Sequence, residues 1–182
     1  MPKYGKLAQQ VLELLATGSQ LGFVRSRKIR GDLFKEADQI WFSIDRKLLT
    51  SLLHRFKLHN YIESIVVANG IEKIRLTNHG RARALEYNFA KLILPSKKKW
   101  DKKWRIVLFD IPEPKKKMRD ALRRKLKKLG FLEFQKSVFI YPFPCRDEVN
   151  FVINFFNIHD CVFYLEAPIS PDISFRSHFK IK

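Results

Sequence analysis

The sequence predicts an α+β protein built from two domains. Apolar residues recur at three- and four-residue spacing in several segments, which is typical of amphipathic helices. Other short runs are rich in β-branched and aromatic residues, as strands are. Residues 95–103 begin with proline, contain five lysines and interrupt both patterns. We therefore expect a domain of residues 1–94, a basic linker of residues 95–103, and a domain of residues 104–182.

The charge of the chain is strongly unbalanced. The 36 Lys and Arg against 18 Asp and Glu give a net charge of +18, and residues 95–136 alone carry 16 basic and 5 acidic side chains. A surplus of this size predicts a polyanionic partner, most often nucleic acid. The hydrophobic share of 46% excludes a disordered basic tail.

The expected location is the cytoplasm. No run of about 18 apolar residues is present, which excludes a membrane-spanning helix, and the N-terminus lacks the apolar core of a secretion signal. The two cysteines, Cys145 and Cys161, make no disulfide framework and fit a reducing compartment. We expect both to be buried core residues.

The first domain is predicted to contain three helices, a two-stranded hairpin and a last helix. In chain order, their apolar positions are Leu7 to Leu15, Leu33 to Ile40, Leu48 to Phe56, Tyr61 to Val67 with Ile71 to Leu76, and Leu85 to Ile93. Gly18 is expected to end the first helix, Ser43 to cap the third, and Thr77 to cap the last. Asn69-Gly70 supplies the positive φ angles that a tight hairpin turn requires.

This order of elements predicts a winged helix-turn-helix. A helix fits the major groove, where its polar side chains reach base edges, while a hairpin lies along the sugar-phosphate backbone. The residues expected to contact nucleic acid are Arg46, Lys47, Thr50, Ser51, His54 and Arg55 on the third helix, and Lys73 and Arg75 on the hairpin. The alternative is that this helical face is only solvated, as most exposed faces are.

The second domain is predicted to have the β-α-β-β-α-β order of a ferredoxin-like fold. In chain order, its elements are a strand from Trp104 to Phe109, a helix from Pro114 to Gly130, two strands within Phe131 to Tyr141, a helix around Val149 to Phe156, and a strand from Cys161 to Leu165. The tail from Ser170 is expected to add an edge strand to this copy or to a partner's.

The helix that ends at Gly130 has one apolar and one strongly basic face. The residues of the basic face are Arg119, Arg123, Arg124, Lys127 and Lys128. Like charges four residues apart destabilise a helix by a few tenths of a kcal/mol each, so phosphates that neutralise them would explain their accumulation. Solvation of the face is the alternative, and the choice between DNA and RNA stays open.

Three segments of the second domain carry a family resemblance. Phe109-Asp110-Ile111, Arg119 to Gly130 and Gln135 to Phe139 resemble the CRISPR-associated endonuclease 2 family of small ferredoxin-like homodimers. Together with Trp104, Asp110-Ile-Pro-Glu113 and the N-terminal winged helix, the chain more closely resembles the phenylacetate-operon repressors, the PaaX-like family, whose central domain has the same nuclease-like fold.

The resemblance implies a homodimeric DNA-binding transcriptional regulator, a repressor, that reads a two-fold-symmetric site in double-stranded DNA. We expect no cofactor and no catalytic residue. We also expect the chain to lack the further C-terminal domain of those repressors, and the sequence identifies no small-molecule effector.

The alternative function is a Mg²⁺-dependent nuclease, or a CRISPR spacer-acquisition component. In the nuclease family an acidic residue matching Asp110 ends the first strand, and two copies across a dimer can hold Mg²⁺. One carboxylate per subunit is a weak magnesium site, and we favour Asp110 as a cap of the following turn through backbone N–H groups. Glu113 is expected to interact with the helix dipole. The five histidines have no ligand spacing, so no zinc site is expected.

Overall fold

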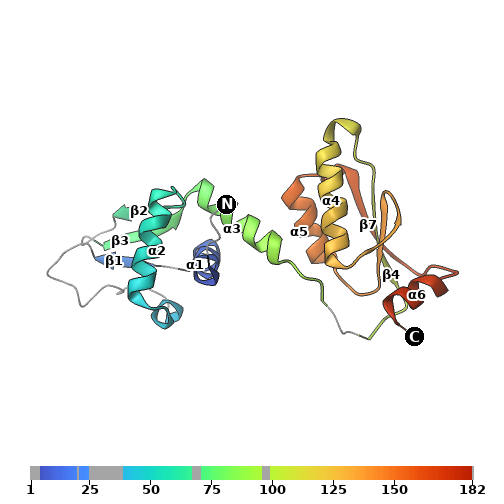
Figure 1. Ribbon diagram of the computed structural model, residues 1–182, viewed down its shortest axis with the longest axis horizontal. Coiled ribbons are helices and arrows are strands. Elements are labelled where there is room, and N and C mark those ends of the chain that lie inside the picture. Colours follow the sequence, from blue (N-terminus) through green and yellow to red (C-terminus); the bar gives the residue numbers. More distant parts are fainter. Residues whose placement is uncertain (1–4, 20, 25–38, 67–70, 96–98, 182) are drawn as a thin grey trace. The chain divides into compact units, whose positions relative to one another are not determined.

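The computed structural model describes residues 5–19, 21–24, 39–66, 71–95 and 99–181. The chain divides into two compact units, Met1–Ala90 and Lys91–Lys182 (Figure 1). Each unit combines helices with an antiparallel sheet, which confirms the α+β class. Among the described helices, none is both long and apolar enough to cross a bilayer.

The N-terminal unit surrounds a three-stranded sheet. Its described elements are α1 (Lys6–Ala16), β1 (Gly22–Val24), η2 (Gln39–Ser43), α2 (Arg46–Leu58), β2 (Ile62–Val66), β3 (Ile71–Leu76) and α3 (Asn78–Lys91). The strands are ordered β1-β3-β2, with both pairs antiparallel. The helix α1, the helix α2 and the two hairpin strands match the predicted segments, whereas β1 was not predicted. The predicted helix at Leu33 to Ile40, except for its end in η2, and the Asn69-Gly70 turn lie outside the described residues.

Two helix caps in this unit were predicted, and one of them was wrong. Asp45 caps α2, because its carboxylate accepts the N–H of Leu48 at 2.9 Å, while Ser43 belongs to the 3-10 turn before it. That turn delays the start of the helix by two residues. At α3 the prediction is confirmed, since the hydroxyl of Thr77 accepts the N–H of Gly80 at 3.0 Å.

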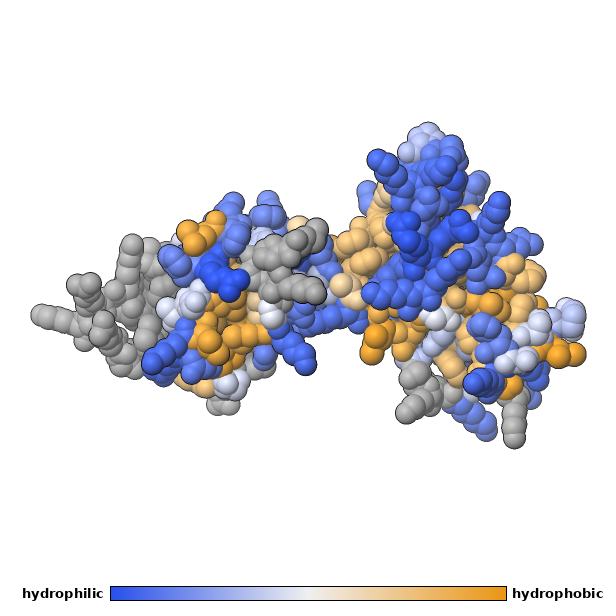
Figure 2. Space-filling model, in the orientation of Figure 1, coloured by the Kyte–Doolittle hydropathy of each residue, from blue (hydrophilic) through white to orange (hydrophobic). Residues whose placement is uncertain are grey.

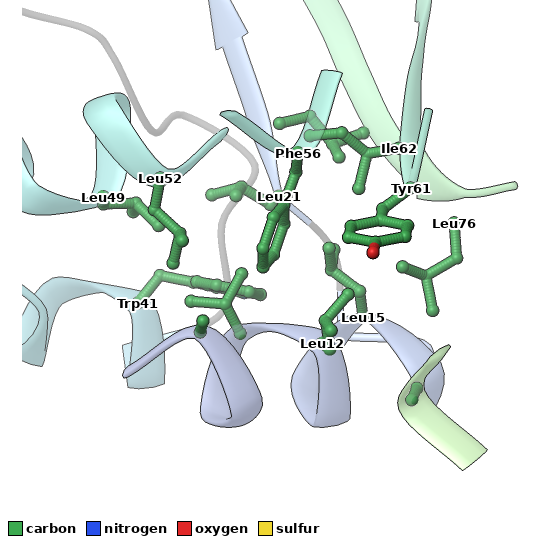
Figure 3. Close-up of a cluster of buried hydrophobic side chains, with 14 of the residues drawn as sticks. Leu12, Leu15, Leu21, Trp41, Leu49, Leu52, Phe56, Tyr61, Ile62 and Leu76 are labelled. Atoms are coloured by element: carbon green, nitrogen blue, oxygen red, sulfur yellow. The ribbon is translucent and has the colours of Figure 1, made fainter. Parts of the chain in front are cut away.

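The core of the N-terminal unit contains side chains from its helices and from its sheet. Figure 3 shows Trp41 and Phe56 directed into the same cluster as Leu12 and Leu21, and all four are buried. Three apolar residues expected on buried faces are exposed instead: Leu48 at 59%, Leu85 at 42% and Ile93 at 81%. The helix α3 buries its small residues Gly80 and Ala84, which lets it pack closely against the sheet.

The C-terminal unit is built on a four-stranded sheet. Its elements are β4 (Trp104–Phe109), η4 (Glu113–Lys115), α4 (Lys116–Leu129), β5 (Leu132–Gln135), β6 (Val138–Tyr141), α5 (Arg146–Phe156), η5 (His159–Cys161), β7 (Val162–Ala167) and α6 (Ile173–Phe179). The strand order is β5-β6-β4-β7, and all neighbours are antiparallel. Gly130 ends α4 in the left-handed region, with φ of 97°, as predicted.

The two faces of this sheet are covered differently. The helices α4 and α5 lie on one face (Figure 1), while α6 packs against the other through Phe175, which meets Trp104 edge to face at 5.5 Å. The prediction of a further strand after Ser170 was therefore wrong. Phe175 and Phe179 are four residues apart, so a helix presents both rings to Trp104. Phe163 and Leu165 on the edge strand β7 stay 55% and 50% exposed.

Candidate nucleic-acid interface

The exposed face of α2 carries short polar and basic side chains. Lys47, Ser51 and His54 are spaced i, i+4 and i+7, which aligns them along the helix, and all three are exposed. The buried residues of α2 lie on the opposite side. The structure thus brings these three predicted residues together on one accessible face, which we call the α2 face. Its width suits the major groove, where such side chains reach base edges.

The other predicted residues of α2 flank this face. Arg46, Thr50 and Arg55 are exposed, and the hydroxyl of Thr50 donates to the backbone carbonyl of Arg46 at 2.8 Å. That hydroxyl therefore keeps only its acceptor capacity for a ligand. Leu58 extends the α2 face at its C-terminal end and is 72% exposed. The sequence analysis did not name Leu58, because only polar and basic residues of this helix were considered for contact with nucleic acid.

The two hairpin cations differ in their accessibility. Lys73 is half-buried on β3, and the Nε of Arg75 donates to the carboxylate of Glu63 across the β2–β3 pair at 2.6 Å. Both partners of that ion pair are largely exposed, so its net stabilising effect is small. In the unbound protein, Glu63 partly neutralises the charge of Arg75. Because the ion pair is weak, Arg75 can release Glu63 and bind a phosphate at little cost.

Three of the five cations predicted on the basic helix form ion pairs. Arg119 donates to Glu113 at 2.8 Å and to the carbonyl of Ile111 at 3.1 Å, and Arg123 donates to Glu133 at 2.5 Å. Lys127 also pairs with Glu133. From the sequence, we expected phosphates to neutralise the repulsion between the cations of this helix. Carboxylates of the same unit already neutralise part of it, so that expectation was only partly right.

These pairs change the titration of the carboxylates. The pKa of Glu133 is lowered mainly by the hydrogen bond from Lys127 and then by that from Arg123. The pKa of Glu113 is lowered mainly by Arg119. Glu113 thus neutralises a guanidinium, whereas the sequence predicted an interaction with the helix dipole. Glu113 lies in η4, six residues before Arg119 in the sequence.

Arg124 and Lys128, the other two predicted residues, are exposed and make no ion pair within the described part of the chain. Figure 2 shows hydrophilic side chains gathered over α4. Lys125, which lies between Arg124 and Lys128 in the sequence, is only 6% exposed. Its pKa is lowered, first by burial and then by the charge of Lys128.

Asp110 is exposed at the end of β4. Its backbone N–H donates to the carbonyl of Cys161 at 2.9 Å, but its carboxylate makes no hydrogen bond within the described residues. The predicted cap of the following turn was therefore wrong, because Arg119 holds that turn through the carbonyl of Ile111. A shallow groove of about 480 Å³ adjoins this carboxylate. Its other ionisable lining residues are Lys116, Arg119, Asp120, Arg123 and Lys136.

The described residues contain no group of three or more His, Cys, Asp or Glu that could hold a metal ion. Cys145 is buried, as predicted, and burial raises the pKa of its thiol to about 12, so it stays protonated at neutral pH. Cys161 is only partly buried, contrary to prediction.

Comparison with known families identifies the C-terminal unit. Residues 97–175 match the family model of the PaaX protein central Cas2-like domain. The match spans η4, α4, Asp110 and the whole four-stranded sheet, and it confirms for this segment the resemblance that the sequence motifs predicted. No curated protein matches the chain.

Proposed function

We propose that this chain is a homodimeric, DNA-binding transcriptional regulator of the PaaX type, a repressor that reads a two-fold-symmetric site. One observation carries the proposal: a domain that matches the central domain of PaaX follows, in the same chain, a unit that exposes the α2 face beside a β-hairpin. The α2 face supplies base contacts, and Lys73 and Arg75 supply contacts to the backbone.

The arrangement of the N-terminal unit supports a winged helix-turn-helix. Its described elements run helix, strand, helix, hairpin, and the first strand pairs with the second hairpin strand in the order β1-β3-β2. In this architecture the helix before the hairpin is the one that enters the major groove. That helix is α2, which begins at Arg46 after its cap Asp45 and presents the α2 face to solvent.

The C-terminal unit supports a ferredoxin-like domain that pairs two copies. Its helices cross over between strands in the order β4-α4-β5-β6-α5-β7, as the split β-α-β arrangement requires. On the sheet face that α6 leaves open, the exposed Phe163 and Leu165 continue the half-buried Leu108. Burial of this apolar surface against a second copy would relate two α2 faces by a two-fold axis.

Selection of bound fragments from random duplex DNA tests the proposal. A regulator of this kind enriches a consensus made of two inverted half-sites, whose centres are about one helical turn or a multiple of it apart. Affinity should also fall steeply with salt, with log K losing about 0.9 per phosphate contact for each unit of log salt. Recovery of unrelated sequences, or of a site without two-fold symmetry, would count against it.

One observation favours the nuclease as a second candidate: the carboxylate of Asp110 is exposed and without a hydrogen bond within the described residues, so it is available to a metal ion. The cations that surround the groove would attract a phosphate but also oppose a metal ion. Incubation with DNA and RNA, with Mg²⁺ or with EDTA, separates the candidates. Cleavage that needs Mg²⁺ and disappears in a folded Asp110→Ala variant would establish the nuclease.

A further inference from the structure

The cations of α4 form two separate rows on the helix surface. Arg119, Arg123 and Lys127, spaced i, i+4 and i+8, all pair with carboxylates of η4 or β5, and we call them the paired row. Lys117, Arg124 and Lys128, spaced i, i+7 and i+11, are exposed and make no ion pair within the described residues; we call them the outer row. The sequence alone could not separate the rows, because both consist of the same residue types.

Helical geometry keeps the two rows apart. At 3.6 residues per turn the outer row falls within a narrow band parallel to the helix axis, about a third of a turn from the paired row. From Lys117 to Lys128 the band is about 16 Å long, at 1.5 Å per residue. A DNA strand carries roughly five phosphates over that length. The outer row thus presents three separated charges to a repeating row of anions.

Nothing in the described structure compensates the outer row. The one acidic residue of α4, Asp120, lies 3.9 Å from Arg123, which belongs to the paired row. Beneath the outer row the buried Lys125 adds a further cation, and its lowered pKa has the charge of Lys128 as one cause. Asp120 lies four residues before Arg124, a spacing at which a carboxylate can pair with a cation, but its ion pair is with Arg123.

We propose that the outer row binds the phosphates of duplex DNA, and that the paired row only holds α4 against η4 and β5. This inference rests on the proposed function, and it divides the basic helix into a DNA-binding part and a structural part. It assigns Lys117 to the interface, and it removes the paired row, three of the five predicted residues, from it.

Two triple variants of the full chain test the division, because each removes three positive charges from the same helix. The first is Lys117→Gln, Arg124→Gln, Lys128→Gln, and the second is Arg119→Gln, Arg123→Gln, Lys127→Gln. Binding to a 30-base-pair duplex of random sequence is measured over a range of salt, together with thermal unfolding. The outer-row variant should lose about 0.9 in the salt slope for each contact removed, with Tm unchanged or raised. The paired-row variant should keep the slope and lose several degrees in Tm.

Each other outcome rejects part of the scheme. Equal losses of slope in both variants would mean that only net charge matters, and the division would be wrong. Loss of affinity for single-stranded RNA but not for the duplex would assign the outer row to RNA. If the wild-type chain binds its selected operator, yet the outer-row variant keeps the wild-type slope, this inference fails and the proposed function stands. Absence of any duplex binding by the wild type would overturn both.

Discussion

The first turn of α3 lies directly against the start of β2: a Cβ added at Gly80 would meet the carbonyl oxygen of Tyr61 at 1.9 Å. The same carbonyl accepts the N–H of Thr77 at 3.0 Å, and the hydroxyl of Thr77 donates to the carbonyl of Asn60 at 2.6 Å. These contacts fix the junction between the hairpin and α3, and therefore the position of the hairpin beside α2. At Gly80 only glycine leaves the necessary space.

We predict that Gly80→Ala destabilises the N-terminal unit by about 1–3 kcal/mol, as overpacking of a close contact does. In an ordinary helical position the same change would stabilise by about 1 kcal/mol, so the sign of the effect is informative. Urea unfolding of the full chain measures it. Ala82→Ser, at an exposed position on the same helix, should change the free energy of unfolding by no more than about 0.5 kcal/mol. A stabilised Gly80→Ala variant would show that the junction yields easily.

The sequence predicted those elements whose signals are local. Periodicity located α1, α2, α4 and α5, and the positive φ of Gly130 follows from its place after the last apolar residue of α4. The strand β1 was not predicted, because three residues are too few to show the alternation of apolar and polar positions that marks a strand. The helix α6 was mistaken for a strand because its apolar residues were interpreted by type, although Phe175 and Phe179 have helical spacing.

The candidate site was predictable in its residue types but not in its pairing. The α2 face followed from alternation of polar and apolar positions along one helix. The pairing of Arg123 with Glu133 did not, since it depends on how β5 returns beside α4. The partner of the buried Arg105 was equally hidden, because Asp101 lies outside the strand, in the segment before it.

Replacement of Lys47 by Ala, and of His54 by Ala, should weaken binding to the selected operator. Each contact to a base or phosphate on the α2 face is worth about 1–3 kcal/mol, roughly 5- to 150-fold in affinity. Both side chains are exposed, so the free energy of unfolding should change by less than about 0.5 kcal/mol. Fluorescence anisotropy with a labelled operator and urea unfolding provide the two measurements.

Lys6→Ala is the matched control for charge, since Lys6 is an exposed lysine on α1 of the same unit. It should leave operator binding nearly unchanged. If Lys6→Ala weakens binding as much as Lys47→Ala does, the effect reports net charge, and the α2 face is not the reading surface.

Acid stability should depend on Asp101. Arg105 is only 2% exposed, and its two terminal nitrogens donate to the two carboxylate oxygens of Asp101 at 2.6 and 2.5 Å. The hydrogen bond from Arg105 lowers the pKa of Asp101 to about 2, below the ordinary value of 3.8. A carboxyl with a lower pKa in the folded state stabilises the fold fully above pH ~4, and that contribution is lost as pH falls toward 2.

Asp101→Asn should therefore lower the free energy of unfolding by about 1 kcal/mol at neutral pH, a value reduced because the Asp101 side chain is 43% exposed. Between pH 4 and pH 2 the variant should lose less stability than the wild type. Urea unfolding at several pH values measures both effects, with Asp160→Asn, an exposed position, as the control. Parallel stability curves for Asp101→Asn and the wild type would show that the pair does not couple protonation to folding.

Dimerisation should depend on the open sheet face of the C-terminal unit. Phe163 and Leu165 lie on the edge strand β7, are 55% and 50% exposed, and project from the same face. A carboxylate at Leu165 would be buried without a partner in a face-to-face dimer, so Leu165→Glu should produce a monomer in light scattering. Ile93→Glu, which replaces another exposed apolar residue of that unit, should leave the dimer intact.

Because two linked winged helices bind one site far more tightly than one does, the monomeric variant should bind a full operator no better than a half-site. A monomeric wild type, or a Leu165→Glu variant that remains dimeric, would place the pairing surface elsewhere.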